Sequence, residues 1–294
     1  MLPRRSNIGP DAVLAERDPG LRDAKLSELG EGWDNVACAV IRDEGEPRVV
    51  LRISKIVDPQ ERSQVVVQDV ALLDFVAQHA SLATNVVAAA DPGNGVLLMS
   101  LVPGEGADRL APRDEAAAAA ALGRFLGGIH RADAPAGLVA AATSLTTWPA
   151  QAQAEFAASA TLFADPDRRA IEAFLAERPP EGAPHNILCH NDLGDEHVIV
   201  DTARSDVVGV IDWSDAVLGD PARDFALLMF DFGPAFCERT LAAYDRPVDS
   251  DLCSRARWFG ARAGVVGVAH RAREHDPGLS STLARLRRVL AYRG

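Results

Sequence analysis

Hydrophobic and polar positions change their spacing about a third of the way along the chain. In the first part, short apolar runs alternate with turns that contain Gly, Pro or Asp, which is typical of antiparallel strands. The runs that predict strands are residues 36–41, 48–53, 86–90 and 96–101. Residues 60–79, between the second and third runs, place Val66, Val70, Leu73 and Val76 three or four positions apart and predict a helix.

The pattern changes after Val102-Pro103-Gly104, where Pro and Gly indicate a linker. Beyond it, apolar residues recur at helical spacing over longer segments, which predict helices at 114–132, 144–160, 166–177, 222–230, 235–244, 252–273 and 280–292. Residues 11–29 are expected to form a helix-rich lead-in, and 30–35 a glycine turn. We therefore predict an α+β protein with two lobes: a small antiparallel β-sheet lobe with one main helix (1–101) and a larger helical lobe (102–294).

Composition limits the classes of function. The chain has 294 residues, enough for two lobes, and a net charge of −12, which argues against nucleic acid as a main partner. No apolar window is long enough for a membrane span, and the first residues lack a signal-peptide pattern, so a cytoplasmic location is expected. The four cysteines are scattered and predict neither a disulfide framework nor a zinc site.

The most informative motif lies in the second lobe. His190-Asn191-Asp192 and His197 precede an apolar strand at 198–200, residues 202–206 form a turn, and a second strand at 207–211 ends at Asp212. The two open ends of an antiparallel hairpin lie together, so Asp192, His197 and Asp212 are expected to meet at one edge. A base beside two potential metal ligands is what phosphoryl transfer from a nucleotide needs.

This pattern, with the continuation Ile211-Asp212-Trp213-Ser214-Asp215 and Gly219-Asp220-Pro221-Ala222-Arg223-Asp224-Phe225-Ala226, resembles the aminoglycoside phosphotransferase family, the kinase-like group of small-molecule kinases. The resemblance implies a protein-kinase-like fold, Mg²⁺ as cofactor and ATP or GTP as phosphoryl donor. It makes Asp192 the catalytic base and Asp212 the principal magnesium ligand. His197 is a second ligand, a hydrogen-bond donor to a phosphate or metal-bound water, or a structural histidine.

The resemblance also implies supporting and nucleotide-binding residues. His190 packs beneath the catalytic loop, and Asp220 accepts hydrogen bonds from its backbone. Arg52 takes the place of the phosphate-binding lysine, in preference to Lys55, whose odd offset points it to the opposite face of the strand. Three further nucleotide-binding roles are implied. Asp69 is the helix carboxylate that orients Arg52, and the turn with Gly30 and Gly32 covers the phosphates. The hinge that reads the base contains Met99 and Leu101.

The acceptor site is expected among the helices of the second lobe. Carboxylates that would attract an amino sugar, or else are simply solvated surface acids, are Asp195, Glu196, Asp215 and Asp231. The chain as a whole predicts an O-phosphotransferase that acts on an antibiotic and confers resistance, with macrolide kinases the nearest motif and GTP then the preferred donor. The alternatives are a kinase for homoserine, choline, a sugar or a nucleoside antibiotic, and a non-catalytic pseudokinase.

Overall fold

The structure, a computed structural model, describes residues 24–32, 34–41, 48–140, 149–181 and 187–293. The chain divides into two compact units. The first contains residues 1–104 and 208–214, and the second contains 105–207 and 215–294. The segment 208–214, which follows the predicted catalytic loop in sequence, therefore groups with the first unit. The predicted division of the chain into lobes 1–101 and 102–294 stays a prediction.

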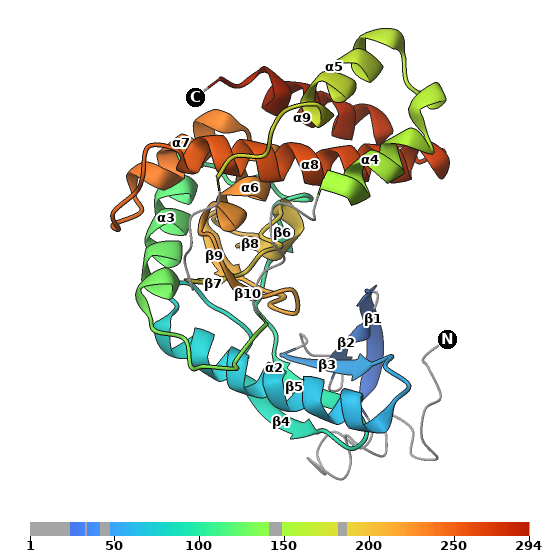
Figure 1. The fold of residues 1–294 in the computed structure, drawn as a ribbon. Helices are drawn as coiled ribbons and strands as arrows, with labels where there is room; N and C mark the ends of the chain where they lie inside the picture. Colours follow the sequence, from blue (N-terminus) through green and yellow to red (C-terminus); the bar gives the residue numbers. More distant parts are fainter. Residues whose placement is uncertain (1–23, 33, 42–47, 141–148, 182–186, 294) are drawn as a thin grey trace. The chain divides into compact units, whose positions relative to one another are not determined.

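The first unit is built on a five-stranded antiparallel sheet in the order β1-β2-β3-β5-β4 (Figure 1). Its strands are β1 (Lys25–Glu31), β2 (Asn35–Ile41), β3 (Val49–Ser54), β4 (Val87–Asp91) and β5 (Val96–Ser100). The last four agree closely with the apolar runs. Lys25–Glu31 corrects the expected helix-rich lead-in, because this polar segment pairs with β2 as an edge strand and takes Gly30 into the sheet. The lead-in residues 11–23 lie outside the described residues.

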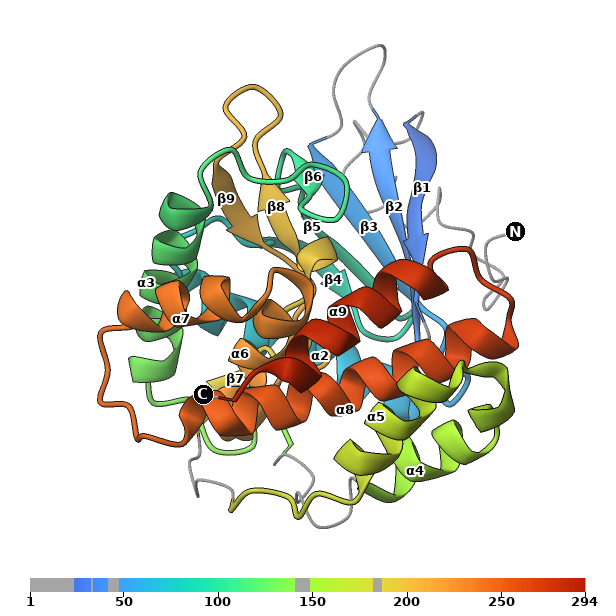
Figure 2. The same cartoon turned by 90° about the horizontal axis from the view of Figure 1, so that it is seen from above.

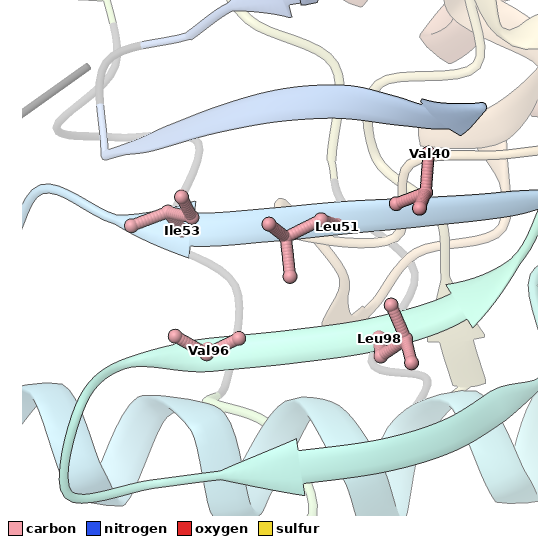
Figure 3. Packing of buried hydrophobic residues seen from close by; sticks show 5 residues of the cluster. All are labelled: Val40, Leu51, Ile53, Val96 and Leu98. Carbon is pink, nitrogen blue, oxygen red and sulfur yellow. The ribbon is translucent and has the colours of Figure 1, made fainter. Parts of the chain in front are cut away.

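Alternation along these strands separates two faces of the sheet. Val40, Leu51, Ile53, Val96 and Leu98 form one buried cluster on three neighbouring strands (Figure 3). Side chains of adjacent residues in a strand point to opposite faces, so Arg52, between Leu51 and Ile53, lies on the other face.

Helix α2 (Pro59–His79) follows β3 and contacts β4. Asp58 caps its first turn by accepting a hydrogen bond from the Glu61 N–H at 2.8 Å, and Pro59 occupies the first helical position. Val66, Leu72, Leu73 and Val76 are buried. The helix brings Asp69 to the side chain of Arg52.

The second unit is mainly helical. It contains α3 (Glu115–Arg131), α4 (Pro149–Ala157), α5 (Asp165–Leu175), α6 (Ala222–Asp231), α7 (Pro234–Ala242), α8 (Leu252–Arg273) and α9 (Leu279–Ala291). Helix α8 packs against α4, α6 and α9 (Figure 2). These helices match the predicted ones closely, except that the first residues expected in α4 lie outside the described part of the chain. In that part, no helix is long and apolar enough to cross a membrane.

Short strands carry the predicted catalytic segment. β7 (Ile187–Cys189) pairs antiparallel with β10 (Val217–Gly219), and β6 (Glu105–Gly106) pairs with β8 (Val198–Val200). A one-turn 3₁₀-helix (Asp195–His197) precedes β8. The turn after β8 closes where the Asp201 N–H donates to the Asp206 carbonyl at 2.9 Å, and β9 (Val207–Val210) follows. The two predicted hairpin strands are therefore present at the predicted residues.

Candidate active site

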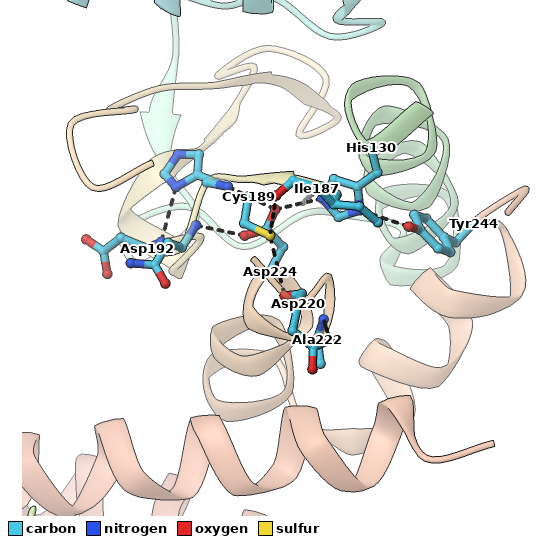
Figure 4. A network of polar contacts seen from close by, with 10 residues as sticks. His130, Ile187, Cys189, Asp192, Asp220, Ala222, Asp224 and Tyr244 are labelled. Carbon is cyan, nitrogen blue, oxygen red and sulfur yellow. Dashed lines mark hydrogen bonds and ion pairs between the residues drawn. The ribbon is translucent and has the colours of Figure 1, made fainter. Parts of the chain in front are cut away.

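One buried carboxylate binds the backbone of the loop that follows β7. Asp224, in the first turn of α6, accepts hydrogen bonds from the backbone N–H of His190 at 3.0 Å and from that of Asn191 at 2.7 Å (Figure 4). Its side chain is fully buried. Two backbone donors on one carboxylate fix the start of the loop, and Asp192 is the next residue.

A second layer supports Asp224. His130, at the end of α3, contacts Asp224 through Nε2 at 2.9 Å and the Tyr244 hydroxyl through Nδ1 at 2.9 Å (Figure 4). Burial by itself would raise the pKa of Asp224, but the hydrogen bond and charge of His130 outweigh it and the pKa is lowered. Asp224 is therefore an ionised acceptor, which suits a carboxylate that binds backbone N–H groups.

Asp192 and His197 lie in contact within the second unit. The carboxylate of Asp192 is 42% exposed, and its Oδ2 is 3.7 Å from Nδ1 of His197. That Nδ1 also lies 2.7 Å from the backbone carbonyl of Asp192, so it carries the proton and donates to this oxygen. His190 is fully buried, and its Nδ1 accepts from the Asp192 N–H at 3.3 Å. Both histidines thus hold the loop from which the Asp192 carboxylate projects.

The acceptor of the two backbone bonds is Asp224, four residues after the one that the resemblance assigned to this role. Asp220 is buried and receives two bonds from Arg255, through Nε at 2.6 Å and Nη2 at 3.2 Å, and one from the Ala222 N–H at 3.0 Å. The sequence places two carboxylates one helical turn apart, and spacing does not distinguish them. A general support role for Asp220 and His190 stays a prediction.

The first unit gathers three of the other predicted residues. Arg52 forms an ion pair with Asp69 of α2. Burial raises the pKa of Asp69, Arg52 lowers it, and the nearby charge of Asp212 raises it further. Asp212 is exposed and has a left-handed backbone, with φ of 63°. Its Oδ1 accepts hydrogen bonds from the Ser214 hydroxyl at 2.6 Å and from the Ser214 N–H at 3.4 Å, which orients the carboxylate.

The other predicted nucleotide residues lie along the sheet. Lys55 reaches β1 and the turn, where Nζ donates to Glu31 at 3.0 Å and to the Gly32 carbonyl at 2.5 Å. Gly30 lies in β1, while the Gly32 N–H donates to the Asn35 carbonyl and closes the turn. Met99 lies within β5, and the Leu101 N–H already donates to the Arg48 carbonyl at 2.9 Å. The pairing of Arg52 with Asp69 supports the choice of Arg52 over Lys55.

The predicted acceptor carboxylates differ in their surroundings. Asp195 and Asp231 are both bound by Arg285 of α9, at 2.8 Å and 2.5 Å, which sequence reasoning did not anticipate. Burial and the charge of Asp195 raise the pKa of Asp231 to about 7. Glu196 is exposed, and Asp215 accepts a bond from the Asn191 side chain through its backbone carbonyl. Asp195 and Asp231 are thus joined by a shared cation.

The fold and the loop define a class, a kinase-like phosphotransferase with a sheet-based unit and a helical unit. Residues 25–258 match the model of the APH family, the phosphotransferase enzyme family. The chain belongs to this family. The predicted family, the protein-kinase-like fold and the enzyme class are thereby confirmed at the level of the family.

Curated relatives match over shorter stretches. Viomycin phosphotransferase of Streptomyces vinaceus is 34% identical over 85 residues, which are 28% of this chain and 29% of that protein. The uncharacterized protein YcbJ of Bacillus subtilis (strain 168) is 39% identical over 59 residues, 20% of this chain and 19% of that protein. The matches therefore span less than a third of either relative.

Solved structures agree over almost the whole chain. The GDP and kanamycin complex of APH(2")-IIIa has a TM-score of 0.70 at 21% identity and covers 95% of this chain and 97% of that one. A macrolide 2'-phosphotransferase from Brachybacterium faecium has a TM-score of 0.62 at 23% identity, with 94% and 97% covered. The streptomycin and ATP complex of APH(2")-IIa has a TM-score of 0.64 at 18% identity, with 96% and 99% covered. At these identities the likeness concerns the fold.

Proposed function

We propose that the protein is a nucleotide-dependent O-phosphotransferase that phosphorylates a hydroxyl of a small-molecule antibiotic and so confers resistance. The observation that carries this proposal is the loop at His190–Asp192, anchored through its backbone to the buried Asp224 while the Asp192 carboxylate stays partly exposed. A base needs this combination, because it must keep a fixed position and still reach a substrate. Family membership and the viomycin-phosphotransferase relative support the reaction class.

In the proposed reaction, Asp192 orients the acceptor hydroxyl and takes its proton as the oxygen attacks the γ-phosphorus. The new O–P bond forms as the bond to the β-phosphate oxygen breaks, and the nucleoside diphosphate leaves with that electron pair. His197 keeps the Asp192 backbone carbonyl in place through Nδ1. In this proposal Arg52, which Asp69 holds through an ion pair, binds phosphate oxygens, for which a guanidinium offers two parallel donors.

Magnesium is implied by the family, and the residues of the first unit fit it. Asp212 offers an exposed, oriented carboxylate, and Mg²⁺ prefers oxygen ligands. The repulsion by which Asp212 raises the pKa of Asp69 is one that a bound cation would relieve. When bound, Mg²⁺ neutralises charge on the phosphates of the donor. His197 fits the hydrogen-bonding role it shows better than that of a ligand, because imidazole nitrogen binds Mg²⁺ poorly.

The chemical class of the acceptor distinguishes two candidate functions, an antibiotic kinase and a metabolic kinase. Structural relatives form complexes with kanamycin and with streptomycin, and one sequence relative is viomycin phosphotransferase. Arg285, however, already offsets part of the negative charge of Asp195 and Asp231. This pairing favours an acceptor with fewer positive charges than a polycationic aminoglycoside, either a macrolide or the small alcohol of a metabolic kinase. The proposed phosphoryl donor is ATP or GTP.

The decisive experiment is an acceptor screen with ATP and GTP tested separately. The panel contains kanamycin, a macrolide, viomycin, a nucleoside antibiotic, homoserine and choline, and mass spectrometry detects the gain of one phosphate. Transfer to an antibiotic that Asp192→Ala abolishes supports the proposal. Transfer to homoserine or choline alone makes the protein a metabolic kinase. Nucleotide binding without transfer to any acceptor makes it a pseudokinase.

A further inference from the structure

Asn191, between His190 and the proposed base Asp192, has a backbone conformation that few residues adopt. Its φ is 68°, in the left-handed region, where asparagine is tolerated better than most residues other than glycine. Its N–H donates to Asp224 Oδ1 at 2.7 Å. The chain therefore turns sharply at Asn191, immediately before the carboxylate that has to be placed.

The side chain of Asn191 continues the ladder between β7 and β10. In that ladder Cys189 is paired with Val217, so on the same register Asn191 would pair with Asp215, two positions further along. The left-handed backbone of Asn191 leaves the extended conformation that a ladder needs. Instead, its side-chain Nδ2 donates to the Asp215 backbone carbonyl at 3.2 Å. A side-chain bond thus replaces a ladder bond and joins the loop to the segment after Asp212.

The other end of the same amide is held by α6. Nη1 of Arg223 donates to Oδ1 of Asn191 at 2.9 Å. Arg223 is buried, and its guanidinium lies 4.9 Å from the ring centroid of Phe259. A guanidinium only donates and a carbonyl only accepts, so the two partners allow one orientation of the amide. Three contacts therefore fix Asn191, two with side chains of α6 and one with the backbone carbonyl of Asp215, which lies two residues before β10.

We propose that Asn191 is a positioning residue for Asp192, in that its amide locks the left-handed turn of the loop to α6 and to the segment that leads into β10; the catalytic part of this inference rests on the proposed function. Asn191 does not take part in the chemistry. It fixes the direction in which the chain enters Asp192, and misplacement of a catalytic group by about 1 Å can cost on the order of 100-fold in rate. The geometric part concerns the loop itself and holds whichever acceptor is used.

The main test variant is Asn191→Gly, which keeps the positive φ but removes both amide bonds. We expect kcat to fall about 10- to 100-fold, while KM for nucleotide and acceptor stays within about threefold. Hydrogen exchange, followed by mass spectrometry, should accelerate in peptides that cover 187–194 and 215–219. The matched control is Ser205→Gly, at a second non-glycine residue with positive φ (58°), in the turn between β8 and β9, and it should change none of these quantities.

A second variant keeps the test decisive if Asn191→Gly folds poorly. Asn191→Asp retains the acceptor for Arg223 but places an oxygen against the Asp215 carbonyl, so faster exchange should appear at 215–219. Unchanged exchange in both peptides overturns the inference. A fall in kcat that is accompanied by a rise in KM and a fall in thermal stability also overturns it, because it would indicate a general structural role. If the wild type transfers phosphate to no acceptor, the proposed function fails, and the exchange experiment still decides whether Asn191 locks the loop.

Discussion

The catalytic loop shows how much depends on single side chains. Asp192, His190 and His197 were found from the sequence because they follow a recognisable spacing around a short apolar strand. Asp224 lies in the stretch that carries the resemblance, but the support role is assigned to Asp220 because spacing does not distinguish the two carboxylates. His130, at the end of an apolar helix, carries no local signal. Their roles depend on contacts across 34 and 94 positions of the chain, which sequence spacing does not encode.

Asp192 should be needed for transfer and not for nucleotide binding. Replacing it by Asn keeps the shape of the side chain and removes the proton acceptor, so we expect kcat to fall by about 10²- to 10⁴-fold. Steady-state transfer and calorimetric nucleotide titration measure the two effects separately. Asp74→Asn removes an exposed carboxylate from α2 and serves as the control. An Asp192→Asn variant with normal kcat would exclude this residue as the base.

Asp231 should make stability depend on pH. Its side chain is only 9% exposed, and burial and Asp195 raise its pKa to about 7. An unfolded Asp has a pKa of about 3.9, so the folded state binds the proton more tightly. The free energy of unfolding contributed by Asp231 therefore falls as pH rises from about 4 to about 7. Asp231→Asn cannot ionise and escapes this loss.

We expect Asp231→Asn to gain roughly 2–3 kcal/mol over the wild type between pH 5 and pH 8. Urea unfolding at several pH values, followed by circular dichroism, gives the difference, and all other titrating groups are shared by the two proteins. A difference that does not change with pH would show that Asp231 ionises normally.

Among helices and strands, the elements that the sequence predicts correctly are those with a buried face, because burial imposes a regular spacing of apolar residues. Strands β2, β3 and β5 have a buried face and flanking turns, and α8 was located to its terminal residues. Strand β1 was missed because it lies at the edge of the sheet and most of its residues are exposed, so nothing imposes alternation. Strands β6, β7 and β10, at two or three residues, are too short to show a period.

The packing of α6 against α8 includes a close backbone contact at Gly260. A Cβ at Gly260 would lie 2.5 Å from the Ala226 carbonyl oxygen, so the two backbones are in close contact. Gly→Ala inside a helix normally stabilises by about 0.5–1 kcal/mol. Here we expect the reverse, a loss of about 1–3 kcal/mol, because the methyl group forces the helices apart.

Gly267→Ala in the same helix is the matched control. Its nearest neighbour would be Thr282 Cγ2 at 3.9 Å, an ordinary contact, so the variant should be as stable as the wild type or slightly more so. Thermal unfolding of the three proteins compares them directly. Equal melting temperatures for Gly260→Ala and Gly267→Ala would show that the α6–α8 contact is not limited by this backbone approach.

Considered as a whole, the molecule distributes the proposed machinery over its two units. Arg52, Asp69 and Asp212 belong to the first unit, while Asp192 and His197 belong to the second. Apolar periodicity indicated the division into a sheet-based part and a helical part. It did not indicate that residues 208–214, far along the chain, group with the sheet, since that depends on the parallel bridge between Ala83 and Gly209.

This distribution separates binding from chemistry in a test on the intact protein. A ligand that binds only the folded state stabilises it by about 2.7 kcal/mol at 100 times its Kd, so nucleotide with Mg²⁺ should raise the melting temperature by several degrees. Asp212→Ala should keep the shift caused by nucleotide alone and lose the increment added by Mg²⁺. Asp192→Ala should keep both, because its carboxylate is assigned to the acceptor hydroxyl. Scanning fluorimetry with ATP and with GTP, each with and without Mg²⁺, measures all four shifts for each protein. A full Mg²⁺ increment in Asp212→Ala would remove this residue from the metal site, and its loss in Asp192→Ala would reassign Asp192 from base to ligand.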